Sequence, residues 1–103
     1  MIEIVWEYTV KRDRAAEFER YYSSSGTWAT LFRRSPAYRE TLLLRDAENR
    51  SRYVTVDRWD DVESFQALRQ KFSSEYEQMD RTCEEFTESE RCLGMFEIVQ
   101  ASS

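Results

Sequence analysis

A chain of 103 residues has room for one hydrophobic core, so we expect a single domain over residues 1–103. Its formal net charge is −5, with Arg and Lys scattered among Asp and Glu. This argues against a nucleic acid partner, because phosphate backbones are bound by clustered positive charge. The absence of histidine excludes a Ser-His-Asp triad, a Cys-His pair and any His-ligated metal or haem.

The first expected element is a β-strand over residues 2–10, IEIVWEYTV. Apolar and aromatic residues occupy every second position, which is typical of a strand with one buried face. The residues of this face are Ile2, Ile4, Trp6, Tyr8 and Val10. Val5 lies on the opposite face, between two glutamates of the same parity.

Two short helices are expected next, over residues 15–22 and 27–34, and the sequence SSSG separates them. The dipeptide SP ends the second helix. Trp28, Leu31 and Phe32 share one face of that helix, because residues three and four apart are neighbours on a helix surface. These three residues could form a plug in the core, the lid of a ligand pocket or part of a subunit contact.

Two further strands are predicted over residues 38–45 and 52–59, where β-branched and aromatic residues are frequent. The polar sequence DAENR between them has the length of a hairpin loop. A closing strand is predicted over residues 93–99, LGMFEIV.

The longest predicted element is a helix over residues 60–88. Its apolar residues recur every three or four positions and form one uninterrupted stripe, which is typical of a helix packed against a core. Asp60 can cap this helix, because Glu63 follows in the spacing of a capping box. We expect a kink near Ser73 and Ser74.

The order of these elements is β-α-β-β-α-β with a broken first helix, which is that of the split βαβ, or ferredoxin-like, fold. We therefore expect an α+β domain in which helices cover one face of a four-stranded antiparallel sheet. The other face would expose Val5 and part of the LLL run in the second strand. A second sheet packed there would bury these residues, so the predicted partner is a second copy of the chain in a homodimer.

The motif WDDVESF after YVTVDR, and the stretch GTWATLFRRSPAY, resemble the antibiotic biosynthesis monooxygenase family of dimeric α+β barrels. The resemblance covers most of the chain. It implies kinship with cofactorless oxygenases of phenolic polyketides and with haem-degrading enzymes. The residues that the haem-degrading members use correspond to positions at or near Trp6, Leu68 and Gln78, and none of these matches. We therefore expect no haem, no other cofactor and no metal.

The resemblance also implies where a site would lie. It places Trp6 on the face toward the helices, across a cleft from the long helix, with the short aromatic helix as a possible lid. The predicted substrate pocket consists of Trp6, Trp28, Phe32, Leu68 and Phe72. Tyr76 is the candidate catalytic residue, because a buried tyrosine hydroxyl needs a hydrogen-bond partner and can serve a bound guest.

Two functions remain open at this stage. The first is a cofactor-independent monooxygenase that acts on a small aromatic or phenolic substrate in the cleft between sheet and helices. The second is a non-catalytic dimeric domain that binds a small ligand or has a structural role. A cavity of several hundred Å³ with Tyr76 pointing into it would favour a ligand site, whereas a cleft filled by Trp6, Trp28 and Phe32 would favour a packed scaffold.

The sequence also predicts a cytoplasmic protein. No apolar run approaches the roughly 20 residues that cross a bilayer, and the start of the chain lacks the features of a signal peptide. With two cysteines, Cys83 and Cys92, we expect reduced thiols and no disulfide framework.

Overall fold

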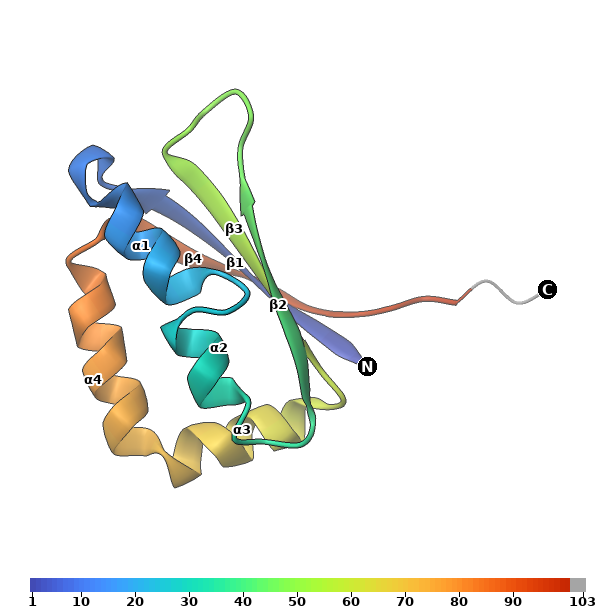
Figure 1. The fold of residues 1–103 in the computed structure, drawn as a ribbon. Coiled ribbons are helices and arrows are strands. Elements are labelled where there is room, and N and C mark those ends of the chain that lie inside the picture. Colours follow the sequence, from blue (N-terminus) through green and yellow to red (C-terminus); the bar gives the residue numbers. More distant parts are fainter. Residues whose placement is uncertain (101–103) are drawn as a thin grey trace.

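Four antiparallel strands form one sheet in the order β2-β3-β1-β4, and the helices lie on one of its faces (Figure 1). The structure is a computed structural model that describes residues 1–100. The strands are β1 (Ile2–Val10), β2 (Tyr38–Arg45), β3 (Arg52–Trp59) and β4 (Thr87–Glu97). The helices are α1 (Ala15–Tyr22), α2 (Thr27–Phe32), α3 (Val62–Lys71) and α4 (Ser73–Glu84), with a short 3₁₀ turn η1 (Arg12–Arg14) before α1.

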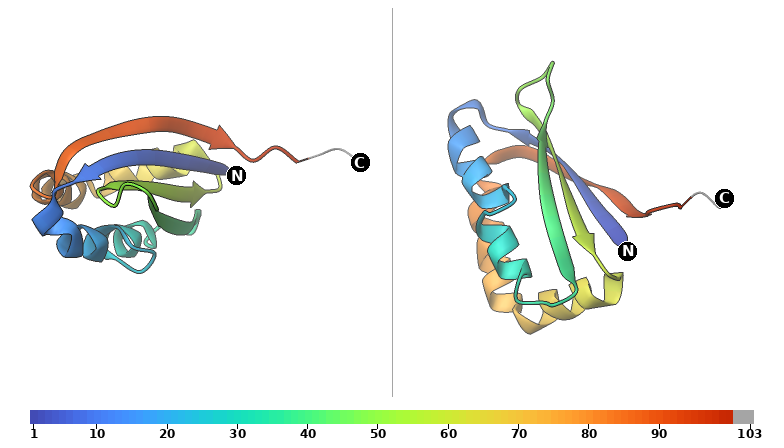
Figure 2. Two further views of the ribbon diagram at one scale, coloured as in Figure 1. Left: turned by 90° about the horizontal axis from the view of Figure 1, so that it is seen from above. Right: turned by 45° about the vertical axis from the view of Figure 1, so that its right-hand side comes forward.

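The predicted α+β, ferredoxin-like architecture is confirmed, including the single layer of helices (Figure 2). The first three strands have the predicted bounds, because a period of two marks both ends of each strand clearly. The fourth strand, predicted over residues 93–99, is wrong in its bounds, because β4 begins six residues earlier and ends at Glu97, two residues earlier. It begins at Thr87 because the polar run ESER pairs with β1 at the edge of the sheet, where burial is not required.

The single long helix predicted over residues 60–88 is wrong in its bounds. It is two helices that meet at Phe72, whose φ of −112° and ψ of 37° lie outside the helical region. The kink predicted near Ser73 and Ser74 is confirmed to within one or two residues. The cap is Asp61, whose carboxylate accepts a hydrogen bond from the Ser64 N–H at 2.7 Å. Asp60 instead pairs with Arg39 at 2.6 Å. The bend lets α3 and α4 form two arms around α2 (Figure 1).

The short aromatic helix α2 ends at Phe32, two residues earlier than predicted. A turn then leads into β2, with the Ser35 N–H donating to the Phe32 carbonyl at 3.0 Å. All the large apolar side chains of α2 are buried, so this helix belongs to the layer that covers the sheet.

Glycine at position 26 is required by close packing between α1 and α2. A Cβ atom there would lie 2.5 Å from the Arg20 carbonyl oxygen and 2.8 Å from the Tyr21 carbonyl oxygen, both of which belong to the backbone. We expect Gly26→Ala to lower the free energy of unfolding by about 1–3 kcal/mol, the usual cost of overpacking. Chemical denaturation checks this, with Ser25→Ala on the exposed loop as a control that leaves stability nearly unchanged. An equal stability of the two variants would contradict the assignment.

Aromatic side chains build the core between the sheet and the helices. Trp59 and Phe18 are fully buried, and Phe86 is 2% exposed. Phe18 stacks on Tyr22 with ring centroids 4.3 Å apart. Such contacts add to the stabilisation from burial alone. Cys83 and Cys92 are free thiols, the first buried and the second exposed.

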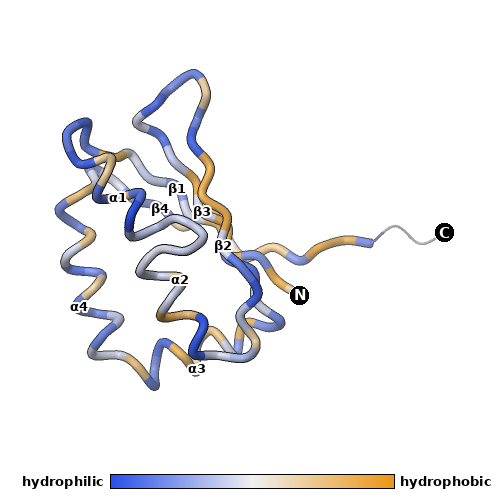
Figure 3. Tube along the Cα trace, viewed as in Figure 1, coloured by the Kyte–Doolittle hydropathy of each residue, from blue (hydrophilic) through white to orange (hydrophobic). Residues whose placement is uncertain are grey.

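The face of the sheet away from the helices carries an apolar strip, which we call the open face. Val5, Val56 and Leu42 are paired across β1, β3 and β2, and Val54 lies beside Leu44 in the same way. Leu42 and Leu44 are exposed. Figure 3 shows the hydrophobic stretch on β2, to which Leu42 and Leu44 belong. No helix within residues 1–100 is long and apolar enough to cross a membrane.

Ion pairs border the open face on both sides of the apolar strip. Arg58 pairs with Glu3 at 2.7 Å and with Glu40 at 3.5 Å. Toward the other end, Arg52 bonds to Glu7. The apolar centre is thus bordered by charged side chains that are already paired within the chain.

Candidate functional site

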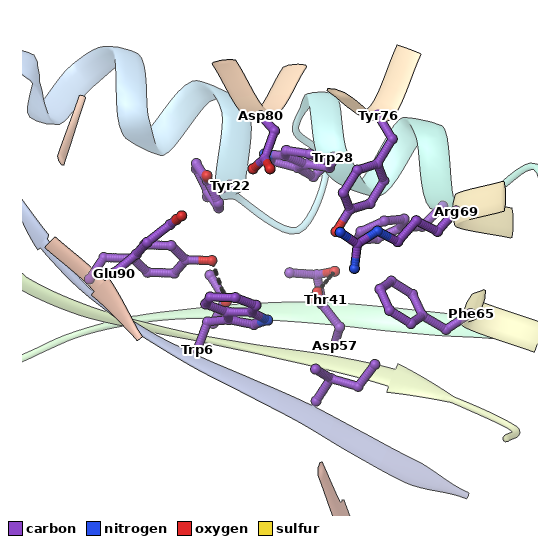
Figure 4. A pocket seen from close by; sticks show the side chains of 14 residues that line it. Trp6, Tyr22, Trp28, Thr41, Asp57, Phe65, Arg69, Tyr76, Asp80 and Glu90 are labelled. Atoms are coloured by element: carbon purple, nitrogen blue, oxygen red, sulfur yellow. Dashed lines mark hydrogen bonds between the residues drawn. The ribbon is translucent and has the colours of Figure 1, made fainter. Parts of the chain in front are cut away.

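A cavity of about 100 Å³ lies between the inner face of the sheet and the helices α2, α3 and α4 (Figure 4). Its walls are mostly aromatic. The aromatic residues that line it are Trp6, Tyr8, Tyr22, Trp28, Phe32, Phe65 and Tyr76. The polar residues that line it are Thr41, Thr55, Asp57, Arg69, Asp80 and Glu90. This combination of aromatic surface with a few polar groups is typical of small-molecule sites.

The structure brings four of the predicted site residues to this cavity: Trp6, Trp28, Phe32 and Tyr76. The other two do not line it. Leu68 is buried in the core, and Phe72 lies at the bend between α3 and α4, where the Arg34 guanidinium stands 4.8 Å from its ring centroid. Both belong to the apolar stripe of the helices and pack there.

Trp28 and Phe32 are packed and also face the cavity. They are 6% and 4% exposed. Trp28 meets the edge of the Tyr76 ring with centroids 4.9 Å apart, and Phe32 packs on Phe65 and Trp59. The two alternatives considered for the short aromatic helix, a plug in the core and the wall of a pocket, therefore both apply to Trp28 and Phe32. The Nε1–H of Trp28 has no hydrogen-bond acceptor within residues 1–100.

Asp57 is the acidic group at the sheet side of the cavity. It lies on β3, whose inward residues are otherwise aromatic or small, and Thr41 Oγ1 on the neighbouring strand donates to its Oδ1 at 2.6 Å. The Tyr38 hydroxyl lies 2.7 Å from Thr41 Oγ1, and it must be the donor because the Thr41 proton is already directed to Asp57. Burial raises the pKa of Asp57 to about 6, and the hydrogen bond from Thr41 opposes this shift.

Sequence reasoning did not single out Asp57, although the sequence contains a signal for it. In RYVTVDRW the positions that face the helices are Tyr53, Thr55, Asp57 and Trp59. A carboxylate at an inward position of a half-buried strand is unusual, because a buried charge is costly unless it is paired. The strand alternation would have revealed it.

Arg69 and Tyr76 form the helix side of the cavity (Figure 4). The Arg69 guanidinium carbon lies 4.9 Å from the centroid of the Tyr76 ring, and Arg69 forms no ion pair in the described part of the chain. Burial raises the pKa of Tyr76 to about 12, so its hydroxyl stays protonated at neutral pH and can donate a hydrogen bond. Both groups are available to a guest.

Two further carboxylates line the cavity, Asp80 on α4 and Glu90 on β4. Burial raises the pKa of Asp80, and Glu84 raises it further; burial raises the pKa of Glu90, and Asp80 adds to that shift. Together with Asp57 these carboxylates outnumber the one guanidinium on the lining. The field in the cavity therefore favours a neutral guest over an anion.

An outer groove of about 370 Å³ adjoins the cavity. The two hollows share Arg69, Tyr76 and Asp80, so they meet along these side chains. The cavity alone is smaller than the several hundred Å³ expected of a ligand site. Within residues 1–100 no group of three or more His, Cys, Asp or Glu residues is placed to hold a metal ion.

A family model described as antibiotic biosynthesis monooxygenase matches residues 1–82 of the chain. The matched part runs from β1 to the last turn of α4 and includes every lining residue of the cavity except Glu90. No curated protein matches the chain significantly.

Solved structures with the same fold include SnoaB, a cofactor-independent oxygenase from Streptomyces nogalater. It has 22% sequence identity and a TM-score of 0.78, with 97% of this chain and 94% of that chain covered. A proposed antibiotic biosynthesis monooxygenase from Bordetella bronchiseptica has 22% identity and a TM-score of 0.77 over 96% and 97% of the two chains. Rv0793 from Mycobacterium tuberculosis has 13% identity and a TM-score of 0.75 over 99% and 98%.

Proposed function

The chain belongs to the antibiotic biosynthesis monooxygenase family, and from this premise we propose that it is a cofactor-independent oxygenase of a small, electron-rich phenol. The observation that carries the proposal is the aromatic cavity with an unpaired guanidinium and a protonated tyrosine hydroxyl on its wall. The likeness in fold to the oxygenase SnoaB supports it.

In the proposed reaction the substrate itself reduces dioxygen. The substrate reacts as a phenol that is the enol tautomer of a CH₂–C=O unit, so the reacting carbon carries one hydrogen. The phenol loses a proton, and its anion passes one electron to O₂, which gives a substrate radical and superoxide. These two combine at that carbon into a peroxide anion, which takes back the proton and becomes a hydroperoxide. The hydroperoxide loses water and leaves a carbonyl, so that overall a CH₂ group and O₂ become a C=O group and H₂O. The chain would stabilise the anion with hydrogen bonds from Tyr76 and Arg69 and would exclude water with its aromatic walls.

The dimensions of the two hollows suggest how such a substrate is held. An apolar cavity of about 150 Å³ accommodates benzene, so the inner cavity of about 100 Å³ suits the edge of one reacting ring. The remaining rings of a polycyclic phenol would lie in the outer groove, past Arg69 and Tyr76.

We propose further that a second copy of the chain covers the open face. Val5, Val54 and Val56, with the exposed Leu42 and Leu44, form an apolar strip that a monomer would leave in water. Each of the surrounding charges is paired within the chain, which reduces the repulsion between two identical faces.

The alternative is a non-catalytic dimeric domain that binds a small aromatic ligand, and the small inner cavity favours it. Both proposals involve the same residues, so the reaction must be measured directly.

The test is oxygen uptake with 1,8-dihydroxyanthrone, an electron-rich phenol whose oxidation at CH₂ gives a quinone. We expect uptake by the unmodified chain and a kcat about 100-fold lower for Tyr76→Phe, which removes one hydrogen-bond donor to the anion. Tyr21→Phe is the matched control, because Tyr21 packs on Phe86 outside the cavity. Equal kcat in both variants would remove the role of Tyr76, and binding of the anthrone without uptake would support the non-catalytic alternative.

A further inference from the structure

We propose that Asp57 is the general base of this site, taking the proton of the phenol at the sheet side of the cavity. The inference rests on the proposed function, because it names the group that starts the proposed reaction. No resemblance or comparison assigns a role to this residue. Three features of the molecule carry it: the hydrogen bonds of the carboxylate, the charges on the cavity lining and the position of the other carboxylates.

The first feature is a chain of hydrogen bonds that orients one oxygen of Asp57. The Tyr38 hydroxyl donates to Thr41 Oγ1 over 2.7 Å, and Thr41 donates to Asp57 Oδ1 over 2.6 Å. Among the first 100 residues no other hydrogen bond reaches the carboxylate, and its Oδ2 is not among the buried polar atoms without a partner. One oxygen is thus fixed, and the second remains accessible to a proton donor in the cavity.

The second feature is the charge of the lining. Three carboxylates and one guanidinium face the cavity, in a chain whose formal net charge is already −5. A phenolate that formed in solution would be repelled on its way in, whereas a neutral phenol would not. The phenol must therefore lose its proton after it has bound, and the protein must supply an acceptor.

The third feature is the position of the candidate acceptors. Glu90 is exposed and lies at the end of the cavity away from Arg69, and Asp80 lies on the helix side, across the cavity from the sheet (Figure 4). Asp57 lies below the Arg69 guanidinium and the Tyr76 hydroxyl (Figure 4), which are the groups suited to hold the resulting anion. The proposed base lies on one side of the cavity and the proposed anion-binding groups lie on the other. A substrate oxygen bound between them could give its proton to Asp57 and then be held as an anion by Arg69 and Tyr76.

The proposed step is a simple proton transfer. The O–H bond of the phenol breaks, its electron pair stays on the phenol oxygen, and an O–H bond forms on Asp57. The carboxylic acid returns its proton to the peroxide anion, which becomes the hydroperoxide that then loses water. Thr41 acts as a positioning residue, because its hydroxyl donates to Asp57 and so orients the carboxylate.

The pH dependence follows from the burial of Asp57, which raises its pKa to about 6. Only the ionised carboxylate accepts a proton, so kcat should rise with pH through this value. The titratable groups that face Asp57 from the surrounding elements are Tyr8 on β1, Tyr38 on β2, Arg69 on α3, Tyr76 and Asp80 on α4, and Glu90 on β4.

The first experiment measures kcat for 1,8-dihydroxyanthrone against pH in three variants. Asp57→Asn should lower kcat by about 10²- to 10⁴-fold, the usual contribution of a general base. It should also abolish the rise of kcat with pH near pH 6, which we call the acid limb of the pH profile. Thr41→Val should move that limb to higher pH, because the lost hydrogen bond favoured the ionised form. Asp13→Asn, at an exposed position outside the cavity, should behave like the unmodified chain. An unchanged limb in Asp57→Asn would overturn the proposal.

Folding of the key variant can be verified independently. The pKa of Asp57 is higher in the folded chain than in the unfolded chain, so its contribution to stability is present below the unfolded pKa and is lost as pH rises through about 6. Asp57→Asn should therefore be at least as stable as the unmodified chain at pH 8. A loss of activity with retained stability isolates the chemistry from the fold.

The second experiment separates this proposal from the proposed function, because it needs no reaction. 4-Nitrophenol is a one-ring phenol whose absorbance reports its ionisation. When it is bound beside the Asp57 carboxylate, its phenolate is disfavoured by the neighbouring negative charge, so its apparent pKa should be higher on the unmodified chain than on Asp57→Asn. Equal values would overturn the role of Asp57 even if oxygen uptake is observed. A difference without any oxygen uptake would support the base and refute the oxygenase.

Discussion

Replacing Trp59 by alanine is expected to lower the free energy of unfolding by about 3–5 kcal/mol, the range for large-to-small changes at fully buried aromatic positions. Trp59 is 0% exposed. Its ring meets the edges of Phe32, Tyr38 and Phe65 with centroids 5.4–5.5 Å apart. Folded domains are stable by only about 5–15 kcal/mol, so this one change would remove much of the stability. Denaturant titration followed by circular dichroism measures the loss.

Trp59→Phe is the matched variant for this prediction. The indole Nε1–H of Trp59 is buried without a hydrogen-bond acceptor in the described residues, so phenylalanine removes an unsatisfied donor along with part of the ring. We expect a loss of about 1–2 kcal/mol, smaller than for alanine because the two effects oppose each other. A loss below about 1 kcal/mol for Trp59→Ala would show that the aromatic cluster around it does not hold the sheet to α2 and α3.

Val56→Asp is expected to convert the proposed homodimer into a monomer. Val56 is at the centre of the open face, paired with Val5 on one side and with Leu42 on the other. A second copy would bury one unpaired carboxylate on each subunit, at a cost of about 3–5 kcal/mol per charge. With two such charges in the dimer, the dissociation constant should rise by roughly four to seven orders of magnitude. Sedimentation equilibrium at micromolar concentration measures the change.

The control for this variant is Gln78→Glu, which adds the same charge at an exposed position of α4. It should leave the mass in solution unchanged. A monomeric mass for the unmodified chain, or a dimeric mass for Val56→Asp, would contradict the proposed partner. Because the cavity lies on the other face of the sheet, loss of the dimer without loss of 4-nitrophenol binding would also show that one subunit contains a complete site.

The strands could be predicted because alternation is local. The face that carries Ile4 and Tyr8 is apolar while its neighbours are polar, and this pattern alone specifies both the strand and its buried side. The polar residues 88–91 have no such pattern, because they lie on an edge strand whose pairing with β1 is set by the backbone. Their strand could not be predicted from side-chain types.

The bend of the long helix was predicted near Ser73 and Ser74, but the apolar stripe that continues across it concealed a full break into two helices. Phe65 before the bend and Met79 after it both pack against the core, so the spacing of side chains is the same as in a straight helix. What the spacing cannot show is that Phe72 leaves the helical region to bring α4 back over α2. The break at Phe72 is determined by tertiary packing and not by the local spacing of side chains.

The aromatic part of the site could be predicted, and its charged part was missed. Trp6, Trp28 and Tyr76 are large aromatic residues on apolar faces, so their inward direction follows from periodicity. Arg69 belongs to the polar pattern of α3, and only the bend lets its side chain reach over the Tyr76 ring. Asp57 could have been predicted from the alternation of β3, because it occupies an inward position, but only the apolar residues of that strand entered the prediction.

The placement of the three tryptophans gives the molecule a built-in optical probe. Trp6 and Trp28 border the cavity, and Trp59 is enclosed in the core beyond reach of any guest. A planar ring that enters would stack against the first two indoles and change their emission, while the third fluorophore would serve as an internal reference. Occupancy of the cavity can thus be followed in the unlabelled chain, before any reaction is known.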